Sequence, residues 1–160
     1  MPALGQEPRL REMVPDDSRR CFHIRARTRE NALSEEQLRE WYGLTPDSLA
    51  ASFGDTLRGW VHEHDGEVVG FAMGDATEGE VTVIALLPEH EGRGVGKALL
   101  DRVTGWLLEQ DCAIPWLLTT ADPALRAYGF YRAQGWRATG EVNEHGEERF
   151  EFDPSLEEPT

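Results

Sequence analysis

The chain has 160 residues, a length that suits one domain with a substantial core, and a formal net charge of -14 at pH 7. This acidic balance argues against nucleic acid or an anionic membrane as a partner, because both are bound by basic surfaces. No apolar run approaches the ~20 residues of a membrane-spanning helix, and the first residues lack the apolar core of a signal peptide.

The two cysteines, Cys21 and Cys112, fit a reduced cytoplasmic protein better than a disulfide framework. No cluster of cysteine and histidine has the spacing of zinc ligands, so we expect no metal site. The expected location is therefore the cytoplasm.

The first third of the chain predicts a strand followed by three helices. The first helix begins at a proline followed by two aspartates, the second at a capping box and the third at a threonine-proline pair, all typical helix starts. The expected elements are a strand over 9–14 and helices over 15–28, from 34 through Trp41 and Tyr42, and from 45 onward.

The middle of the chain predicts three strands and a long helix. Leu57–His64 and Glu67–Asp75 are joined by Asp65–Gly66, a strong hairpin turn. A second turn leads into the strand Glu80–Leu87. Large apolar residues then recur at helical spacing over 94–110, so this helix is expected to pack on a sheet.

The last third predicts a strand, a helix and a closing hairpin. Trp116–Thr120 is mostly apolar, which favours a central strand. Asp122 and Pro123 are typical of a helix start, and this helix is expected to run to Gln134. The final strands are expected over 136–142 and 149–153.

This order of elements predicts an α/β (α+β) fold in one domain over residues 1–160. The central sheet is expected to be mixed and mostly antiparallel, with helices on both faces. The core is expected over about 9–153, and residues 154–160 are expected to form a loose tail.

The junction after the strand Glu80–Leu87 is the most informative segment. A proline ends the strand, and the glycine-rich loop Glu91–Lys97 opens directly into a helix. Such a loop leaves backbone N–H groups accessible, and the helix start adds a partial positive charge, so the segment predicts a phosphate or pyrophosphate site. Its spacing fits neither a P-loop, because Ala98 replaces the magnesium-binding hydroxyl, nor a dinucleotide fingerprint.

Two motifs resemble the GNAT superfamily of acetyl-CoA-dependent N-acetyltransferases. Glu91-x-x-Gly94-x-Gly96 is similar to its Gln/Arg-x-x-Gly-x-Gly/Ala signature. The segment 122–136 resembles its pattern Asn-x-x-Ala-x-x-Phe-Tyr-x-x-x-Gly-Phe, and the matching residues are Ala127, Phe130, Tyr131 and Gly135. The resemblance covers roughly residues 9–153 and implies a GNAT-type sheet whose middle strands splay apart to admit CoA.

Two positions depart from the family pattern. Glu91 stands where the family has Gln or Arg, so its carboxylate is expected to point away from a pyrophosphate or to weaken binding slightly. Ala124 stands where the family has an asparagine that often contacts the pantetheine. Neither change removes the backbone cradle, so CoA binding is still expected.

The resemblance implies acetyl-CoA as co-substrate and names the groups that would hold it. The strand backbone of Ile84, Ala85 and Leu86 would pair with the pantetheine, and an N–H near Leu86 would polarise the acetyl carbonyl. The pyrophosphate would lie on the loop, whose residues are Gly92, Arg93, Gly94, Val95, Gly96 and Lys97. The side chains of Arg93 and Lys97 could add positive charge.

The resemblance also implies a general acid. Tyr131 aligns with the tyrosine that protonates the CoA thiolate in many GNAT enzymes. Tyr128, three residues earlier on roughly the same helix face, is a weaker candidate. Either could instead be a core aromatic residue.

The general base is open at this stage. Glu80 precedes Leu86 by six residues, so strand alternation predicts that both lie on one face, and this offset matches the glutamate base of the histone-acetyltransferase branch. Burial near the acetyl group would raise its pKa toward a useful range. Thr119 matches the base position of the branch that acetylates ribosomal-protein N-termini, but it cannot act as a base. Glu78, His62 and a water chain are the other candidates.

Substrate recognition is expected near the second helix and the last hairpin. Trp41 and Tyr42 could form an aromatic lid. Further candidates are Trp60 or Trp136 as cleft-lining residues, and three glutamates that could attract an ammonium group, Glu144, Glu147 and Glu148.

The leading hypothesis is an N-acetyltransferase that acts on a small amine, an amino-acid-like compound or a peptide amine, by direct attack in a ternary complex. The acidic surface suits such a cationic substrate. The alternatives are a non-catalytic acyl-CoA-binding regulatory module on the same fold and an unrelated phosphate-binding α/β domain. A homodimer formed through a sheet edge or the final hairpin is compatible with the resemblance.

Overall fold

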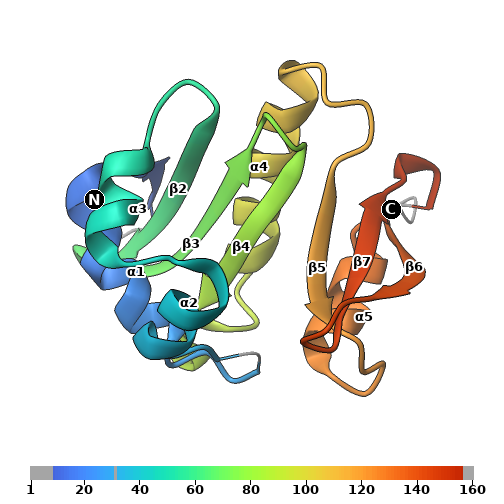
Figure 1. The fold of residues 1–160 in the computed structure, drawn as a ribbon, viewed down its shortest axis with the longest axis horizontal. Helices are drawn as coiled ribbons and strands as arrows, with labels where there is room; N and C mark the ends of the chain where they lie inside the picture. Colours follow the sequence, from blue (N-terminus) through green and yellow to red (C-terminus); the bar gives the residue numbers. More distant parts are fainter. Residues whose placement is uncertain (1–8, 31, 157–160) are drawn as a thin grey trace, which may run out of the picture.

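The computed structural model describes residues 9–30 and 32–156, and its centre is a seven-stranded sheet in the order β1-β2-β3-β4-β5-β7-β6 (Figure 1). Neighbouring strands are antiparallel except β4 and β5, which are parallel. The strands are β1 (Arg9–Glu12), β2 (Leu57–His64), β3 (Glu67–Asp75), β4 (Glu80–Leu86), β5 (Trp116–Thr120), β6 (Trp136–Val142) and β7 (Glu147–Phe152).

Helices cover both faces of this sheet, and each face has its own apolar core. The helices are α1 (Ser18–Arg25), α2 (Glu35–Tyr42), α3 (Pro46–Ser52), α4 (Val95–Glu109) and α5 (Arg126–Ala133). Buried residues of α1–α3 pack with Phe71 and Met73 on one face. Buried residues of α4 and α5 pack with Trp60, Trp136 and Phe150 on the other. The expected mixed, mostly antiparallel sheet with helices on both faces is confirmed.

The parallel strands β4 and β5 stay together at only one end. Glu80 and Trp116 form their single registered pair, and beyond it the strands diverge (Figure 1). Each of the other neighbouring strand pairs has a longer ladder. The expected splay of the middle strands is therefore present, and it leaves much of one edge of β4 without a backbone partner from β5.

A β-bulge interrupts β4 near its start. The register with β3 shifts between Met73 and Gly74, so that Thr82 is an extra residue on β4. Its hydroxyl donates to the Met73 carbonyl oxygen at 3.3 Å. A bulge reverses the side-chain alternation of the strand that contains it.

Two predicted helices begin later than expected. The first is divided into a 3₁₀ helix over Pro15–Asp17 and α1, which ends at Arg25. The last begins at Arg126, because the Asp122 carboxylate accepts the Ala124 N–H within a turn and does not cap a helix. Local helix-start patterns are weaker than the tertiary contacts that set these boundaries.

Smaller differences occur at strand ends and at the C-terminus. β1 ends at Glu12, β4 at Leu86, and β7 begins at Glu147, earlier than the expected start at residue 149. Within the expected tail, Pro154–Leu156 form a 3₁₀ helix. The rest of that tail, 157–160, lies outside the described residues.

Candidate functional site

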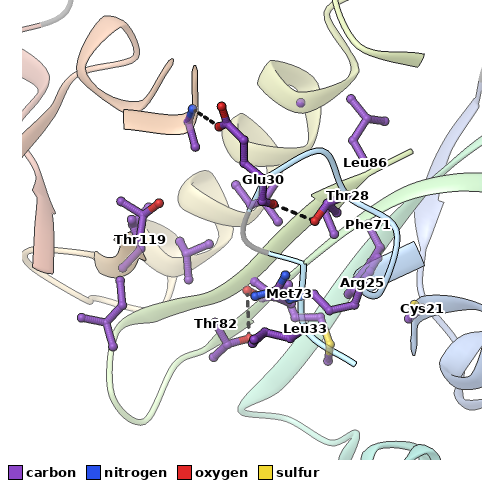
Figure 2. A pocket seen from close by; sticks show the side chains of 18 of the residues that line it. Cys21, Arg25, Thr28, Glu30, Leu33, Phe71, Met73, Thr82, Leu86 and Thr119 are labelled. Carbon is purple, nitrogen blue, oxygen red and sulfur yellow. Dashed lines mark hydrogen bonds between the residues drawn. The ribbon is translucent and has the colours of Figure 1, made fainter. Parts of the chain in front are cut away.

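A cavity of about 720 Å³ lies where β4 and β5 diverge. Both strands line it, together with the glycine-rich loop, α5 and the segment around α1 and α2. Figure 2 shows part of this lining, in which Arg25 and Leu33 come from the N-terminal helical segment, Phe71 from β3, and Thr82 and Leu86 from β4.

The glycine-rich loop has the backbone that an anion cradle needs. Gly92 and Gly94 have φ of +79° and +82°, which L side chains rarely adopt. A Cβ added to Gly96 would lie 3.5 Å from the ring of Phe130. Gly94 precedes α4 and caps it with no side chain, so the first N–H groups of that helix are left for other acceptors.

Not every expected loop residue borders the main cavity. Gly92, Gly94, Gly96 and Lys97 line it, and the Lys97 ammonium is 2.7 Å from the Asp101 carboxylate. Val95 is buried in the core beneath α4, and Arg93 borders a smaller hollow. That hollow also contains three histidines, His62, His64 and His90.

The carboxylate of Glu91 is paired with two arginines. Its Oε1 lies 2.8 Å from Arg29 Nε and 3.5 Å from Arg126 Nη1, and the side chain is 16% exposed. The two guanidinium groups offset the negative charge that replaces the family Gln or Arg. This arrangement explains how an acidic residue is accommodated beside an anion cradle.

The β4 backbone offers an unpaired edge to the cavity. Ile84, Ala85 and Leu86 pair with β3 on one side and line the cavity on the other. With β5 paired only at Glu80, the outer N–H and C=O groups of this stretch have no partner strand within residues 9–30 and 32–156. An extended ligand can therefore add to this edge as a strand does.

The bulge places Glu80 and Leu86 on opposite faces of the sheet, contrary to the expectation from strict alternation. Val81 packs with the α4 cluster, whereas Val83 packs with the α1–α3 cluster, although the two are only two residues apart. The extra residue Thr82 causes this reversal. Glu80 therefore shares the face of Val83, and it still lines the cavity, as Leu86 does.

Glu80 is a carboxylic acid with a raised pKa. Burial is the main cause, and the nearby carboxylates of Asp75, Glu78 and Glu147 add to it, so that its pKa is about 7. Arg149 opposes the rise. A carboxyl group with a pKa near neutrality can accept a proton under ordinary conditions.

Tyr131 lines the same cavity from α5, and its side chain is almost fully buried. Its ring is surrounded by Phe130, Trp136 and Phe150, with ring centroids 5.3 to 6.5 Å away. Burial raises the pKa of Tyr131 to about 12, and the nearby Arg25 opposes the rise. The phenol therefore keeps its proton at neutral pH and can donate it.

Tyr128 does not border the cavity, so it does not fit the role of substitute acid. Its hydroxyl donates to Glu148 Oε1 at 3.2 Å, and its ring packs edge-on against Phe150. Glu148 also accepts the Gly140 N–H and is buried, which leaves it poorly placed to attract an ammonium group. Glu144 does not line the cavity either.

The two expected lid residues reach across to the last hairpin. The Tyr42 hydroxyl donates to Glu147 Oε1 at 2.9 Å, and both residues line the cavity. The Trp41 ring stacks on His145 at 4.2 Å between centroids, but Trp41 does not line the cavity. These contacts join α2 to the β6–β7 turn at one end of the splay.

The other tryptophans and candidate bases lie elsewhere. Trp60 packs against Trp106 under the Arg102 guanidinium, and Trp136 is buried in the core. Neither lines the cavity, and the same holds for the alternative bases Glu78 and His62. Thr119 is buried in its wall.

Several charged residues that line the cavity were not identified from the sequence, among them Arg25 and Glu30 of the α1–α2 segment. Glu147, a sequence candidate for attracting an ammonium group, lines the cavity as well. The Glu30 carboxylate accepts the backbone N–H groups of Arg126 and Ala127 at 2.8 and 3.0 Å and so caps α5. About 96 residues separate these partners, and no local pattern reports such a contact.

Among the described residues, no group of histidine, cysteine and carboxylate side chains is arranged to hold a metal ion. Over the same part of the chain, none of the helices combines the length and the apolar character needed to cross a membrane.

The amino-acid sequence is similar to a protein family and to individual N-acetyltransferases. The family model described as the acetyltransferase (GNAT) family matches residues 16–136. Uncharacterized N-acetyltransferases of Mycobacterium tuberculosis and Mycobacterium bovis are 32% identical over an 80-residue alignment, which covers 48% of this chain and 51% of each relative. The match thus spans about half the length of these curated relatives.

Solved structures share the fold at low sequence identity. The PaiA N-acetyltransferase of Thermoplasma acidophilum, crystallised with coenzyme A, is 16% identical with a TM-score of 0.74, covering 92% of this chain and 99% of that one. The ribosomal-protein-S18-alanine N-acetyltransferase of Escherichia coli is 19% identical with a TM-score of 0.67, covering 96% and 97%.

Proposed function

Because this chain belongs to the GNAT family of acetyltransferases, we propose that it transfers the acetyl group of acetyl-CoA to a primary amine by direct attack in a ternary complex. One observation carries the proposal. A carboxyl group with a pKa of about 7, Glu80, and a protonated phenol, Tyr131, border the same cavity as the glycine-rich loop and the free edge of β4.

Two parts of the cavity suit two parts of acetyl-CoA, the glycine-rich loop for the pyrophosphate and the β4 edge for the pantetheine. The N–H groups that follow Gly92 and Gly94 suit a pyrophosphate, since positive φ and the lack of side chains let an anion approach the backbone. The β4 edge over Ile84, Ala85 and Leu86 suits the amide groups of pantetheine. Acetyl-CoA supplies an activated thioester carbonyl, and an N–H of this edge would polarise it.

We assign the base role to Glu80. The amine must lose a proton to attack, and Glu80 accepts one with a pKa close to neutrality. The new C–N bond forms as the C–S bond breaks, and no electrons are gained or lost by the protein. Glu80 then returns its proton to solvent.

We assign the acid role to Tyr131. The leaving thiolate requires one proton, and the buried phenol keeps its own until a stronger base forms beside it. Arg25 lies close enough to favour the phenolate that results. Solvent protons restore the phenol after the product leaves.

The test is calorimetric titration with acetyl-CoA, followed by measurement of thiol release from the same sample across a panel of amines. Binding with thiol release for at least one amine is the expected result. Binding without release for any amine would favour the non-catalytic acyl-CoA-binding module, for which the replacement of the family asparagine by Ala124 is the supporting observation. No binding would overturn the assignment of the glycine-rich loop.

A further inference from the structure

The cavity continues past β4 as an apolar arm beneath the N-terminal helices. Its floor is formed by β2, β3 and β4, and its roof by α1–α3 and the segment between them. Leucine, phenylalanine and methionine side chains dominate this part (Figure 2). We call it the apolar arm and define it by Leu33, Leu38, Leu49, Leu57, Phe71 and Met73.

The strand register gives the arm its direction and length. Leu57 pairs with Asp75, and Asp75 pairs with Glu80, so the three residues form one row across β2, β3 and β4. Neighbouring strands lie ~4.8 Å apart, so the backbones of Glu80 and Leu57 are separated by about 10 Å. Leu57 packs on the α1–α3 face, which is also the face of Glu80.

The end of the arm near Glu80 is polar and carries a small net negative charge. Glu80, Glu147 and Arg25 line the cavity there. With Glu80 ionised, these three lining side chains carry a net charge of about minus one (-2 + 1). Asp75, Glu78 and Arg149 also act on Glu80, but they lie outside the cavity lining. Glu147 is held in place, because its Oε1 accepts from the Tyr42 hydroxyl at 2.9 Å and from Asn143 Nδ2 at 3.0 Å.

This combination points to a substrate class. We propose that the acceptor is an apolar monoamine whose single ammonium group lies between Glu80 and Glu147 and whose hydrocarbon body, of about five or six carbons, fills the apolar arm toward Leu57. The inference rests on the proposed acetyl transfer and deepens it. One ammonium balances the net charge of these three lining side chains, and a hydrocarbon body matches the apolar walls beyond them.

Two other occupants fit the arm less well. A diamine would place its second ammonium among leucine, phenylalanine and methionine side chains, where the cavity lining holds no carboxylate. Asp75 stands between Leu57 and Glu80 in the same row, but it does not border the cavity. A longer acyl chain on CoA would have to pass Glu80 and would leave that carboxylate buried against hydrocarbon.

The test needs only the unmodified protein and acetyl-CoA. We expect kcat/KM for propylamine, butylamine, pentylamine and hexylamine to rise about fourfold per added methylene, which corresponds to about 0.8 kcal/mol each. Pentylamine should exceed butane-1,4-diamine, which has the same number of heavy atoms, by about tenfold or more. A flat series, or a preference for the diamine, would overturn the inference.

The same assay separates this inference from the proposed function. Thiol release with ethanolamine or lysine that exceeds release with pentylamine would overturn the substrate class and leave acetyl transfer standing. Thiol release with hexanoyl-CoA that exceeds release with acetyl-CoA would assign the arm to the acyl chain and also overturn the substrate class. No release with any amine would overturn both.

A pair of variants locates the arm. Leu57→Phe narrows its far end, so we expect the ratio of kcat/KM for hexylamine to that for propylamine to fall about tenfold. Leu108→Phe is the matched control, since Leu108 is exposed on α4 and does not line the cavity, and it should leave the ratio as in the wild type. An unchanged ratio in Leu57→Phe would show that long amines do not reach Leu57. The amine series alone remains decisive should the variant fold poorly.

Discussion

Tyr131 and Tyr128 occupy the same short helix but have different surroundings. Tyr131 is buried among aromatic rings at the wall of the cavity, whereas the Tyr128 hydroxyl donates to Glu148 away from it. The sequence places the two tyrosines on similar helix faces. Phe150 contacts both rings, so the difference comes from Glu148, which accepts from the Tyr128 hydroxyl, and from Trp136, which packs near the Tyr131 ring.

Replacing Tyr131 by Phe removes the proposed acid while keeping the ring. We expect kcat to fall by roughly 100-fold, the low end of general acid catalysis, with the acetyl-CoA affinity nearly unchanged. Steady-state kinetics and calorimetry measure the two quantities. Tyr128→Phe is the control and should leave kcat close to the wild-type value. Equal kcat in wild type and Tyr131→Phe would remove Tyr131 from the mechanism.

Glu80→Gln should change the pH dependence of the rate. Only the ionised carboxylate accepts a proton, so wild-type kcat/KM is expected to rise with pH through about 7 and then level off. In the variant this rise should disappear and the plateau rate should fall by roughly 100-fold. A variant that keeps the rise would place the base at another residue.

The same substitution should raise stability at high pH. The folded-state pKa of Glu80 lies above its ordinary value of 4.5, so the folded protein loses stability as pH rises from about 4.5 through about 7. Glutamine does not ionise, and the variant should therefore melt higher than the wild type at pH 8 and similarly at pH 4. Thermal unfolding at both pH values measures this. Glu109→Gln, at an exposed site on α4, is the control and should show no such difference.

Part of the candidate site could be predicted from the sequence. The glycine-rich loop, Tyr131 and Glu80 were all predicted from motifs and spacing, and all but two of the expected loop and strand residues border the cavity. The sequence argument for Glu80 assumed strict alternation along β4, and the bulge at Thr82 breaks that alternation. Glu147 was a candidate for attracting an ammonium group and lines the cavity, whereas Arg25 was missed because its place there depends on contacts between distant segments.

Gly94 in the loop and Gly105 in α4 differ in whether their backbone conformation requires a glycine. Gly94 has φ +82° at the start of α4, whereas Gly105 lies within the helix with open space around its Cα. Gly94→Ala should strain the loop, cost about 1 kcal/mol or more of stability and weaken acetyl-CoA binding. Gly105→Ala should stabilise by up to about 1 kcal/mol and leave binding unchanged. Thermal unfolding and calorimetry measure both, and a neutral Gly94→Ala would argue against the cradle.

Most elements were predicted within a few residues, because hairpin turns, capping boxes and apolar periodicity are local. The start of α5 was not, because its cap is the carboxylate of Glu30, which belongs to the segment after α1. The division of the first helix also escaped prediction. Asp17 accepts the Val14 N–H and pairs with Arg11, contacts that stabilise a 3₁₀ turn rather than a continuous helix start.

The two parts of the sheet are joined by few direct links. One registered pair connects β4 and β5, and side-chain contacts such as Tyr42 with Glu147 and Trp41 with His145 span the splay at one end. A ligand bound between the strands adds contacts to both parts. At an acetyl-CoA concentration of about 100 times Kd, the free energy of unfolding should rise by about 2.7 kcal/mol.

Hydrogen exchange can locate that stabilisation. Amides of β4 beyond the bulge and of β5 should exchange more slowly with acetyl-CoA present, because they border the proposed binding site. Amides of β1 and of the outer strand β6 should change least. Uniform slowing throughout the chain, with no excess at β4 and β5, would argue against binding in the splay.

Because of the bulge, the number of residues in β4 decides which face of the sheet Glu80 occupies. Deleting Thr82 would restore regular alternation, and Glu80 would then turn toward α4, away from the face on which Arg25 and Leu57 lie. Every proposed functional side chain would still be present in such a protein, but the Glu80 carboxylate would lie on the α4 face of the sheet instead of the α1–α3 face. A relative that lacks one residue at the position of Thr82 is therefore expected to differ in activity, even if all its proposed functional residues are the same.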